Sequence, residues 1–256
     1  MESDEQVPEY IEFERLEDTT ENFGAVVEQL HSDNWKINFE AINTLRKLNK
    51  FRKDELVNSI QECIEVVVVL VDSPRSSLAK QCLIWLTELF SSFHENLIPI
   101  VTKLSSLLLV KSTNEKSFIR QEATKSIQKI CENFHPVPEI IEIFRSNCFH
   151  KSPALSQNSF TVLSLALLKL PEGQAFDICL SLDSCSRQNI KVACKTTIKG
   201  LSTTWAGFNQ HLASLDENKK KIVEAYLAEK GRRLSLREQR MAEKSEKKQE
   251  EPADNI

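Results

Sequence analysis

The amino-acid sequence predicts an all-α fold, an α-solenoid of about six helical hairpins. Two observations predict it. Apolar residues recur at helical spacing over most of the chain, and a unit of apolar helix, short polar turn and second apolar helix returns several times. With 256 residues and 41% hydrophobic content, the chain is long enough to bury a continuous core.

Five short polar turns set the period of the repeat. They are SDN (32–34), DSPRS (72–76), STNEK (112–116), HKSPA (150–154) and DSCSRQ (183–188). Counted from Asp33 through Asp72, Asn114 and Lys151 to Asp183, the steps are 39, 42, 37 and 32 residues. Helical-hairpin repeats of the HEAT type have roughly 40 to 47 residues. The hairpins are therefore interpreted as HEAT-like.

In each hairpin, one apolar helix precedes the turn and a second follows it. First helices are predicted at 21–31, 54–71, 95–110, 138–149 and 174–182, and second helices at 35–48, 76–90, 117–134, 154–170 and 188–205. A sixth unit, at 206–227, would close the array and cover its last apolar face. Capping residues and a first-turn proline stand at the expected starts of second helices: Asp33, Ser76, Ser117 and Ser152 or Pro153.

One segment conflicts with its local propensity. IEVVVVLV (64–71) contains four consecutive β-branched residues, which favour strands. No partner strand lies nearby, and repeat context commonly overrides propensity, so we predict a helix here.

Composition argues against catalysis and against bound cofactors. The chain has five glycines and no glycine-rich phosphate loop, and its five histidines are scattered over different repeats. Its seven cysteines lie in apolar segments without metal-ligand spacing, so we expect reduced, buried thiols. We predict no enzyme activity, no catalytic residues, no cofactor and no metal.

Charge and apolar runs divide the chain into three parts. Residues 1–20 form an acidic extension, 21–230 the repeat domain, and 231–256 a charged tail without apolar periodicity. The longest apolar run (66–71) is too short to span a bilayer, and the acidic start does not resemble a signal peptide. We therefore expect a cytosolic protein with no membrane span, and nothing in its charge predicts a nucleic-acid partner.

The intra-repeat turns provide the candidate site. In stacked hairpins these turns align along one edge of the array. Here they carry an aromatic followed by single cations: Trp35, Lys36, Arg75, Lys116, Arg120, Lys151, Arg187 and Lys191. Such a row suits an acidic protein surface. Trp35 is also in phase with Phe39 and Ile42, so packing in the core is the alternative to contact with a partner.

The opening DNWKINFEAINTLRKL (33–48) resembles the start of TOG domains, especially those of the CLASP and crescerin families. The segments at 76–90, 114–130, 188–201 and 205–227 resemble the second, third, fifth and closing segments of such domains. The resemblance covers about residues 21–230 and implies a flat paddle of six HEAT repeats.

The resemblance also implies a partner and assigns site residues. The partner would be the αβ-tubulin dimer or the microtubule, in the cytoplasm and cytoskeleton, including the cilium and axoneme or the centrosome and basal body, where other cytoskeletal or ciliary proteins could also bind. Trp35 and Lys36 would serve the first turn and Pro74 and Arg75 the second. Later turns would use Lys116, Arg120, Lys151, and Arg187 or Lys191. Trp35 is then interpreted as a contact residue.

A second hypothesis remains open. The chain could be a HEAT scaffold that binds a non-tubulin protein through its helical faces, with turns that only cap helices. An apolar, solvent-facing groove between helices would support this hypothesis.

Overall fold

A computed structural model of the chain describes residues 10–19, 23–134 and 137–228. Within these ranges the structure contains thirteen α-helices and two 3-10 helices, and no strand, which confirms the all-α class. The predicted charged tail (231–256) and residues 1–9 and 20 of the acidic extension lie outside the described residues. No helix in the described part is both long and apolar enough to cross a membrane.

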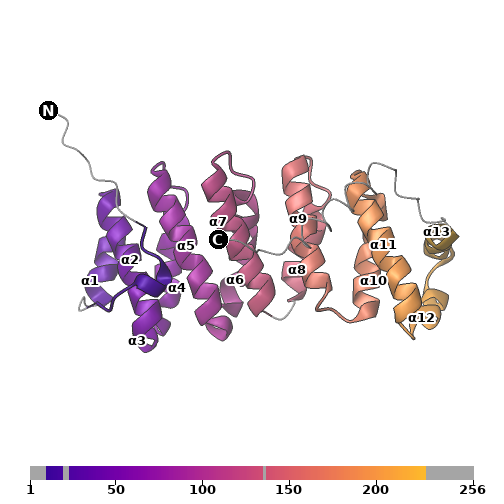
Figure 1. Cartoon of the computed structure of the whole chain (residues 1–256), viewed down its shortest axis with the longest axis horizontal. Coiled ribbons are helices and arrows are strands. Elements are labelled where there is room, and N and C mark those ends of the chain that lie inside the picture. The colour runs from indigo at the N-terminus through magenta and orange to yellow at the C-terminus, as the bar shows by residue number, and fades with distance from the viewer. Residues whose placement is uncertain (1–9, 20–22, 135–136, 229–256) are drawn as a thin grey trace, which may run out of the picture.

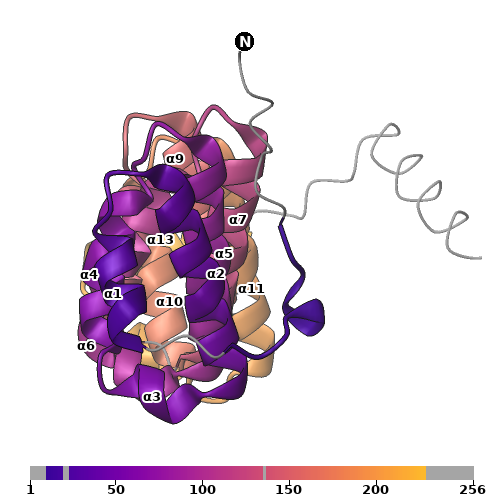
Figure 2. The same ribbon diagram turned by 90° about the vertical axis from the view of Figure 1, so that its left-hand side faces the viewer.

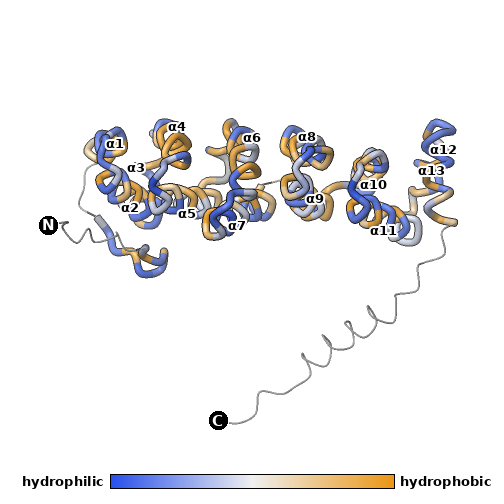
Figure 3. The backbone as a smooth tube through the Cα atoms, turned by 90° about the horizontal axis from the view of Figure 1, so that it is seen from above, coloured by the Kyte–Doolittle hydropathy of each residue, from blue (hydrophilic) through white to orange (hydrophobic). Residues whose placement is uncertain are grey.

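The helices form two layers, as the solenoid prediction requires (Figures 1 and 3). The first layer contains α1 (Phe23–Leu30), α4 (Ile60–Leu70), α6 (His94–Lys111), α8 (Pro138–Asn147) and α10 (Glu172–Ser181). The second contains α2 (Trp35–Phe51), α5 (Ser76–Ser92), α7 (Ser117–Asn133), α9 (Pro153–Leu167) and α11 (Gln188–Thr204). The closing unit consists of α12 (Phe208–Ser214) and α13 (Glu217–Ala228).

The valine-rich segment is helical, as predicted. In α4, Ile60, Cys63, Ile64 and Val67 are all buried, and α4 contacts both α1 and α5. Burial on two sides outweighs the poor helix propensity of a β-branched run. The helix is shorter than expected, because a separate helix, α3 (Lys53–Val57), precedes it and the chain turns at Asn58 and Ser59 between them.

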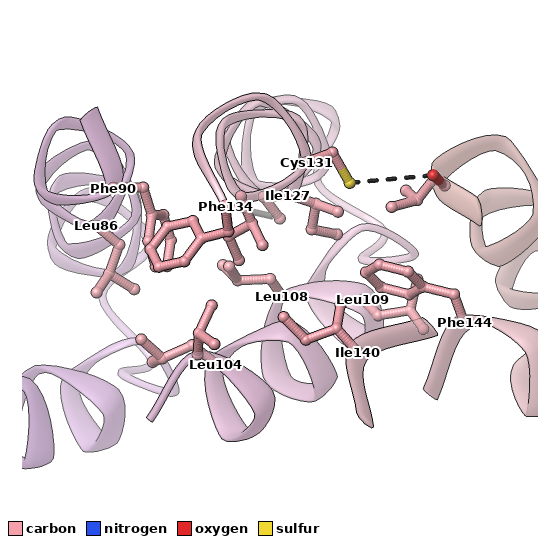
Figure 4. Packing of buried hydrophobic residues seen from close by; sticks show 14 of the residues in the cluster. Leu86, Phe90, Leu104, Leu108, Leu109, Ile127, Cys131, Phe134, Ile140 and Phe144 are labelled. Carbon is pink, nitrogen blue, oxygen red and sulfur yellow. Dashed lines mark hydrogen bonds between the residues drawn. The ribbon is translucent and has the colours of Figure 1, made fainter. Parts of the chain in front are cut away.

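One continuous core runs between the two layers (Figure 4). Trp85, Phe90, Phe93 and Phe134 are buried in this core, and Trp205 packs against it while only half-buried. All seven cysteines are free and buried, which confirms the prediction of buried thiols. One of them, Cys131 in α7, directs its thiol at the Val162 carbonyl of α9, 4.0 Å away, and so joins successive repeats.

The second layer contains a buried polar network between α2 and α5. The Arg46 guanidinium holds Glu88 through two nitrogens, with Nη2 2.6 Å and Nε 2.9 Å from carboxylate oxygens. The Gln81 amide donates to Asn43 Oδ1. Burial raises the pKa of the Glu88 carboxyl, and its bonds to Arg46 partly offset this effect. Because buried polar groups need matched partners, this network fixes how α2 sits on α5.

Residues 10–19 cross the outer surface of this first part of the second layer (Figures 1 and 2). We call them the N-terminal strap. They contain one 3-10 turn, η1 (Phe13–Arg15), the side chain of Tyr10, which packs against the core, and the buried side chain of Leu16. The described part of the acidic extension is therefore docked on α2 and α5.

Candidate functional site

The intra-repeat turns all lie along one edge of the solenoid, the upper edge in Figure 1, and the connections between repeats lie along the other. We call the row of intra-repeat turns the turn edge. The sequence prediction that these turns align is thus confirmed by the fold. The candidate residues on this edge have different surroundings from turn to turn.

Four of the turns share the same side-chain-to-backbone hydrogen bond. A side chain accepts the backbone N–H two residues later in each: Asn34 from Lys36 at 3.0 Å, Ser73 from Arg75 at 3.2 Å, Asn114 from Lys116 at 2.9 Å, and His150 from Ser152 at 3.1 Å. These bonds satisfy N–H groups that a helix start leaves without a partner. They fix the backbone on which Trp35, Arg75 and Lys116 stand.

Trp35 begins α2 and is half-buried. Its ring packs against the core on one side, and the Arg75 guanidinium of the second turn lies 5.7 Å from its centroid on another. This cation–π contact joins the first two turns into one surface. Both sequence alternatives for Trp35 therefore have a physical basis, since the indole is anchored by the core and partly open to solvent.

Three candidate cations occupy the residue immediately before a second helix: Arg75 before α5, Lys116 before α7 and Arg187 before α11. None of the three side chains makes a capping hydrogen bond. A positive charge at a helix N-terminus opposes the helix dipole, at a cost of about 0.3–1 kcal/mol. These positions are therefore poor choices for helix stability alone.

The cations differ in accessibility. Arg75, Lys116 and Lys151 are exposed, and among the described residues Lys116 and Lys151 make no ion pair. Arg120 instead folds back, and its Nη1 donates to the Asn114 and Glu115 carbonyls of its own turn, each at 2.8 Å. Its charge stays near the edge, but its geometry is set by the turn.

The fifth turn donates hydrogen bonds to the fourth turn. Arg187 Nη2 donates to the Lys151 carbonyl at 2.8 Å, and the Cys185 thiol donates to the Cys148 carbonyl at 3.3 Å. Arg187 and Lys191 are both only half-exposed. The structure brings Trp35 with Arg75, and Lys151 with Arg187, into direct contact; it does not bring all the cations into one continuous patch.

Sequence reasoning missed several residues of this edge. Lys111, at the end of α6, pairs with Asp72 of the second turn, and Asn158 of α9 donates to the Ser112 carbonyl at 2.9 Å. A groove of about 650 Å³ lies between the third and fourth turns, with the polar residues Asn114, Arg120 and Asn158 in its lining. Acidic residues also interrupt the row of cations, namely Asp33, Asp72, Glu115 and Asp183. The turn edge is therefore of mixed charge, and only the spacing of Asp and Asn in the turns hinted at this.

A second concave surface lies away from the turns. An apolar groove of about 650 Å³ separates α9 from α11 in the second layer, with Phe160, Leu165, Leu168 and Leu201 among its lining residues. Leu168 is 83% exposed. Within the described residues, no cluster of His, Cys, Asp and Glu has the geometry of a metal site.

Residues 16–202 match the family model described as CLASP N terminal. Human and mouse TOG array regulator of axonemal microtubules protein 1 are each 23% identical to the chain, over 114 and 121 residues, or 44% and 47% of this chain. These alignments span only 7% of either relative.

Solved structures have the same architecture. A structure from work on crescerin, which uses a TOG domain array to regulate microtubules in the primary cilium, aligns with a TM-score of 0.56 and 16% identity over 83% of this chain and 92% of that one. The TOG domain of human Cep104 aligns with a TM-score of 0.55 and 14% identity, over 79% and 89% of the two chains. The chain belongs to the CLASP N-terminal family, and its helical scaffold has the fold of a TOG domain.

Proposed function

We propose that this chain is a non-enzymatic microtubule-regulating TOG domain that binds αβ-tubulin through its turn edge. The relatives named for axonemal and ciliary microtubules make the cytoskeleton of the cilium a candidate location. The observation that carries the proposal is the half-exposed Trp35 ring, held by the core below and by Arg75 beside it.

An aromatic with this support suits a binding anchor. Its ring is fixed before binding, so little side-chain entropy is lost when a partner covers it, and interface anchors are commonly Trp or Arg. Arg75 and Lys116 lie at the starts of α5 and α7, where the helix dipole disfavours a positive charge. An acidic partner would offset that cost, and αβ-tubulin is the acidic partner that the family resemblance suggests.

The experiment measures binding of the chain to unpolymerised tubulin and to microtubules, by size-exclusion chromatography and co-sedimentation. Trp35→Ala should weaken binding about 30-fold if it removes an anchor contributing about 2 kcal/mol. Lys116→Glu and Lys151→Glu should each weaken it about 2- to 5-fold, since both side chains are exposed.

The matched control is Lys53→Glu, which makes the same charge change in α3, at the opposite edge of the solenoid. It should leave tubulin binding unchanged. Trp35→Ala also removes packing, so its thermal unfolding is measured alongside, and the two lysine variants serve as tests that leave the core intact. The proposal fails if the lysine variants and the control bind equally well.

A second candidate function rests on the groove between α9 and α11. Its apolar lining is the feature expected of a scaffold that binds another protein through its helical faces. If this candidate is correct, Leu168→Glu will abolish binding to such a partner and the turn variants will not affect it.

A further inference from the structure

The N-terminal strap is held mainly by polar contacts. The Tyr10 hydroxyl donates to the Ser77 carbonyl at 3.1 Å, and its ring lies edge-on to Phe39 with centroids 5.6 Å apart. Leu16, six residues later, is 3% exposed. The residues between these two anchors form the short turn η1, which contributes no buried residue.

Cations on α2 and α5, and Arg52 directly after α2, contact the strap along its length. Lys50 Nζ donates to the Glu14 and Leu16 carbonyls at 2.8 and 2.9 Å. Arg52 Nη1 donates to the Thr19 carbonyl at 2.9 Å, and Lys80 Nζ lies 4.2 Å from the Tyr10 ring centroid. The receiving surface therefore offers the strap three cations, one aromatic contact and one aliphatic contact. We call this surface of α2 and α5 the strap site.

The strap itself is acidic. Residues 10–19 contain four carboxylates, Glu12, Glu14, Glu17 and Asp18, against one cation, Arg15. This acidic segment meets Lys50, Arg52 and Lys80, and the hydrogen bonds that Lys50 and Arg52 donate to it go to backbone carbonyls, which any extended peptide offers. Recognition of this kind does not depend on the peptide belonging to the same chain.

Two further observations separate the strap from the repeat core. The family match begins at residue 16, so Tyr10 lies before the part that the family shares. The strap also lies beside the polar network of α2 and α5, where Glu14 is close enough to Glu88 to raise the pKa of that carboxyl. Separable interfaces are more polar than cores.

We propose that the strap site is a docking surface for an acidic, extended segment of a partner protein that carries an aromatic residue and, six residues later, a leucine. The strap covers this site in cis and competes with the partner. The site lies mainly on the second-layer surface, and its Tyr10 end reaches Ser77, two residues beyond Arg75 of the turn edge.

The test uses the full chain and a fluorescent peptide with the sequence of residues 8–20 as the probe. Tyr10→Ala with Leu16→Ala removes the two anchors of the cis strap and should raise probe affinity at least tenfold over wild type. Adding Lys50→Glu and Lys80→Glu should abolish that gain. Adding Lys219→Glu and Lys221→Glu in α13 instead, the same charge change far from the strap site, should leave the gain in probe affinity intact.

A probe with its glutamates replaced by glutamine should bind more weakly and with less dependence on salt. Hydrogen exchange on the wild-type chain gives a readout that needs no variant. Amides of residues 10–16 should exchange through local opening, faster than those of α2.

Three results would overturn the proposal. The anchor variant could bind the probe no better than wild type, or the strap amides could exchange only with global unfolding, which would make the strap part of the core. Concentration-dependent dimers of wild type that exchange straps would assign the strap site to a second copy of the chain instead of a partner.

Discussion

The two ends of the second layer are built differently. Between α2 and α5, charged and amide side chains interlock and the strap covers the outside. Between α9 and α11, small and apolar residues such as Ala193, Ser164 and Leu168 leave an open groove. In the same repeat fold, the interface between α2 and α5 is therefore fixed by directional bonds and covered by the strap, and we call it the fixed joint. The interface between α9 and α11 is held mainly at its turns, and we call it the open joint.

This difference bears on the turn edge. Trp35 and Arg75 belong to the fixed joint, so their relative position is set before any partner arrives. Lys151 and Arg187 belong to the open joint, where bonds between the fourth and fifth turns hold them together. Binding by the first two turns would then require less ordering than binding by the last two.

The largest loss of stability should come from disrupting the interface between α2 and α5. Arg46→Ala leaves the Glu88 carboxylate buried without its partner, and the expected loss is about 3–5 kcal/mol of unfolding free energy. Urea denaturation measures it. Arg145→Ala removes an exposed pair with Glu142, and that control should lose less than about 1 kcal/mol.

The loss from Arg46→Ala should also depend on pH. Burial already raises the pKa of Glu88, and removing Arg46 raises it further, so the folded state takes up a proton more readily than the unfolded state. The penalty should therefore be largest near pH 7 and shrink as pH falls toward the ordinary pKa of a glutamate. A penalty that is constant from pH 7 to pH 5 would contradict the assignment of a buried charge.

At the other end of the chain, two glycines test the aromatic cluster of the closing unit. A Cβ on Gly207 would lie 2.9 Å from Trp205 Nε1 and 3.1 Å from Cε2. Trp205 itself contacts Phe176, Phe208 and His211. Gly207→Ala must displace the indole from these rings, and we expect a loss of about 1–3 kcal/mol in thermal or urea unfolding.

Gly200 is the matched position, in the interior of α11, where an added Cβ would meet no atom within 4 Å beyond the backbone of its own helix and the adjoining residues. Gly200→Ala should stabilise the chain by about 0.5–1 kcal/mol, because alanine loses less backbone entropy in a helix. Equal effects of the two substitutions would show that Trp205 does not pack as described.

The repeat pattern predicted the fold well because turn spacing and helical periodicity reflect local conformational preferences of the chain. Turn spacing and helical periodicity placed α2 at Trp35, and they favoured a helix for the valine run against its propensity. The break between α3 and α4 was missed, since nothing in the apolar pattern marks Asn58 and Ser59 as a turn.

The candidate site was less predictable, because the direction of a long cation is set by tertiary contacts. Arg75 reaches the Trp35 ring of the preceding repeat, Arg120 turns back to its own turn, and Arg187 leans on Lys151. The sequence predicted only an acidic extension where Tyr10 and Leu16 dock the strap. The spacing of the turns in the sequence identified the positions of these residues but not their tertiary contacts.

The smallest effect on stability should come from the open groove. Leu168 is 83% exposed at the end of α9, so Leu168→Glu should change the unfolding free energy by no more than about 0.5 kcal/mol. Leu163, fully buried earlier in the same helix, is the contrast, and Leu163→Ala should cost about 2–5 kcal/mol. If Leu168→Glu instead costs more than about 1 kcal/mol in urea denaturation, α9 and α11 close over this residue in solution, and the distinction between a fixed and an open joint would be lost.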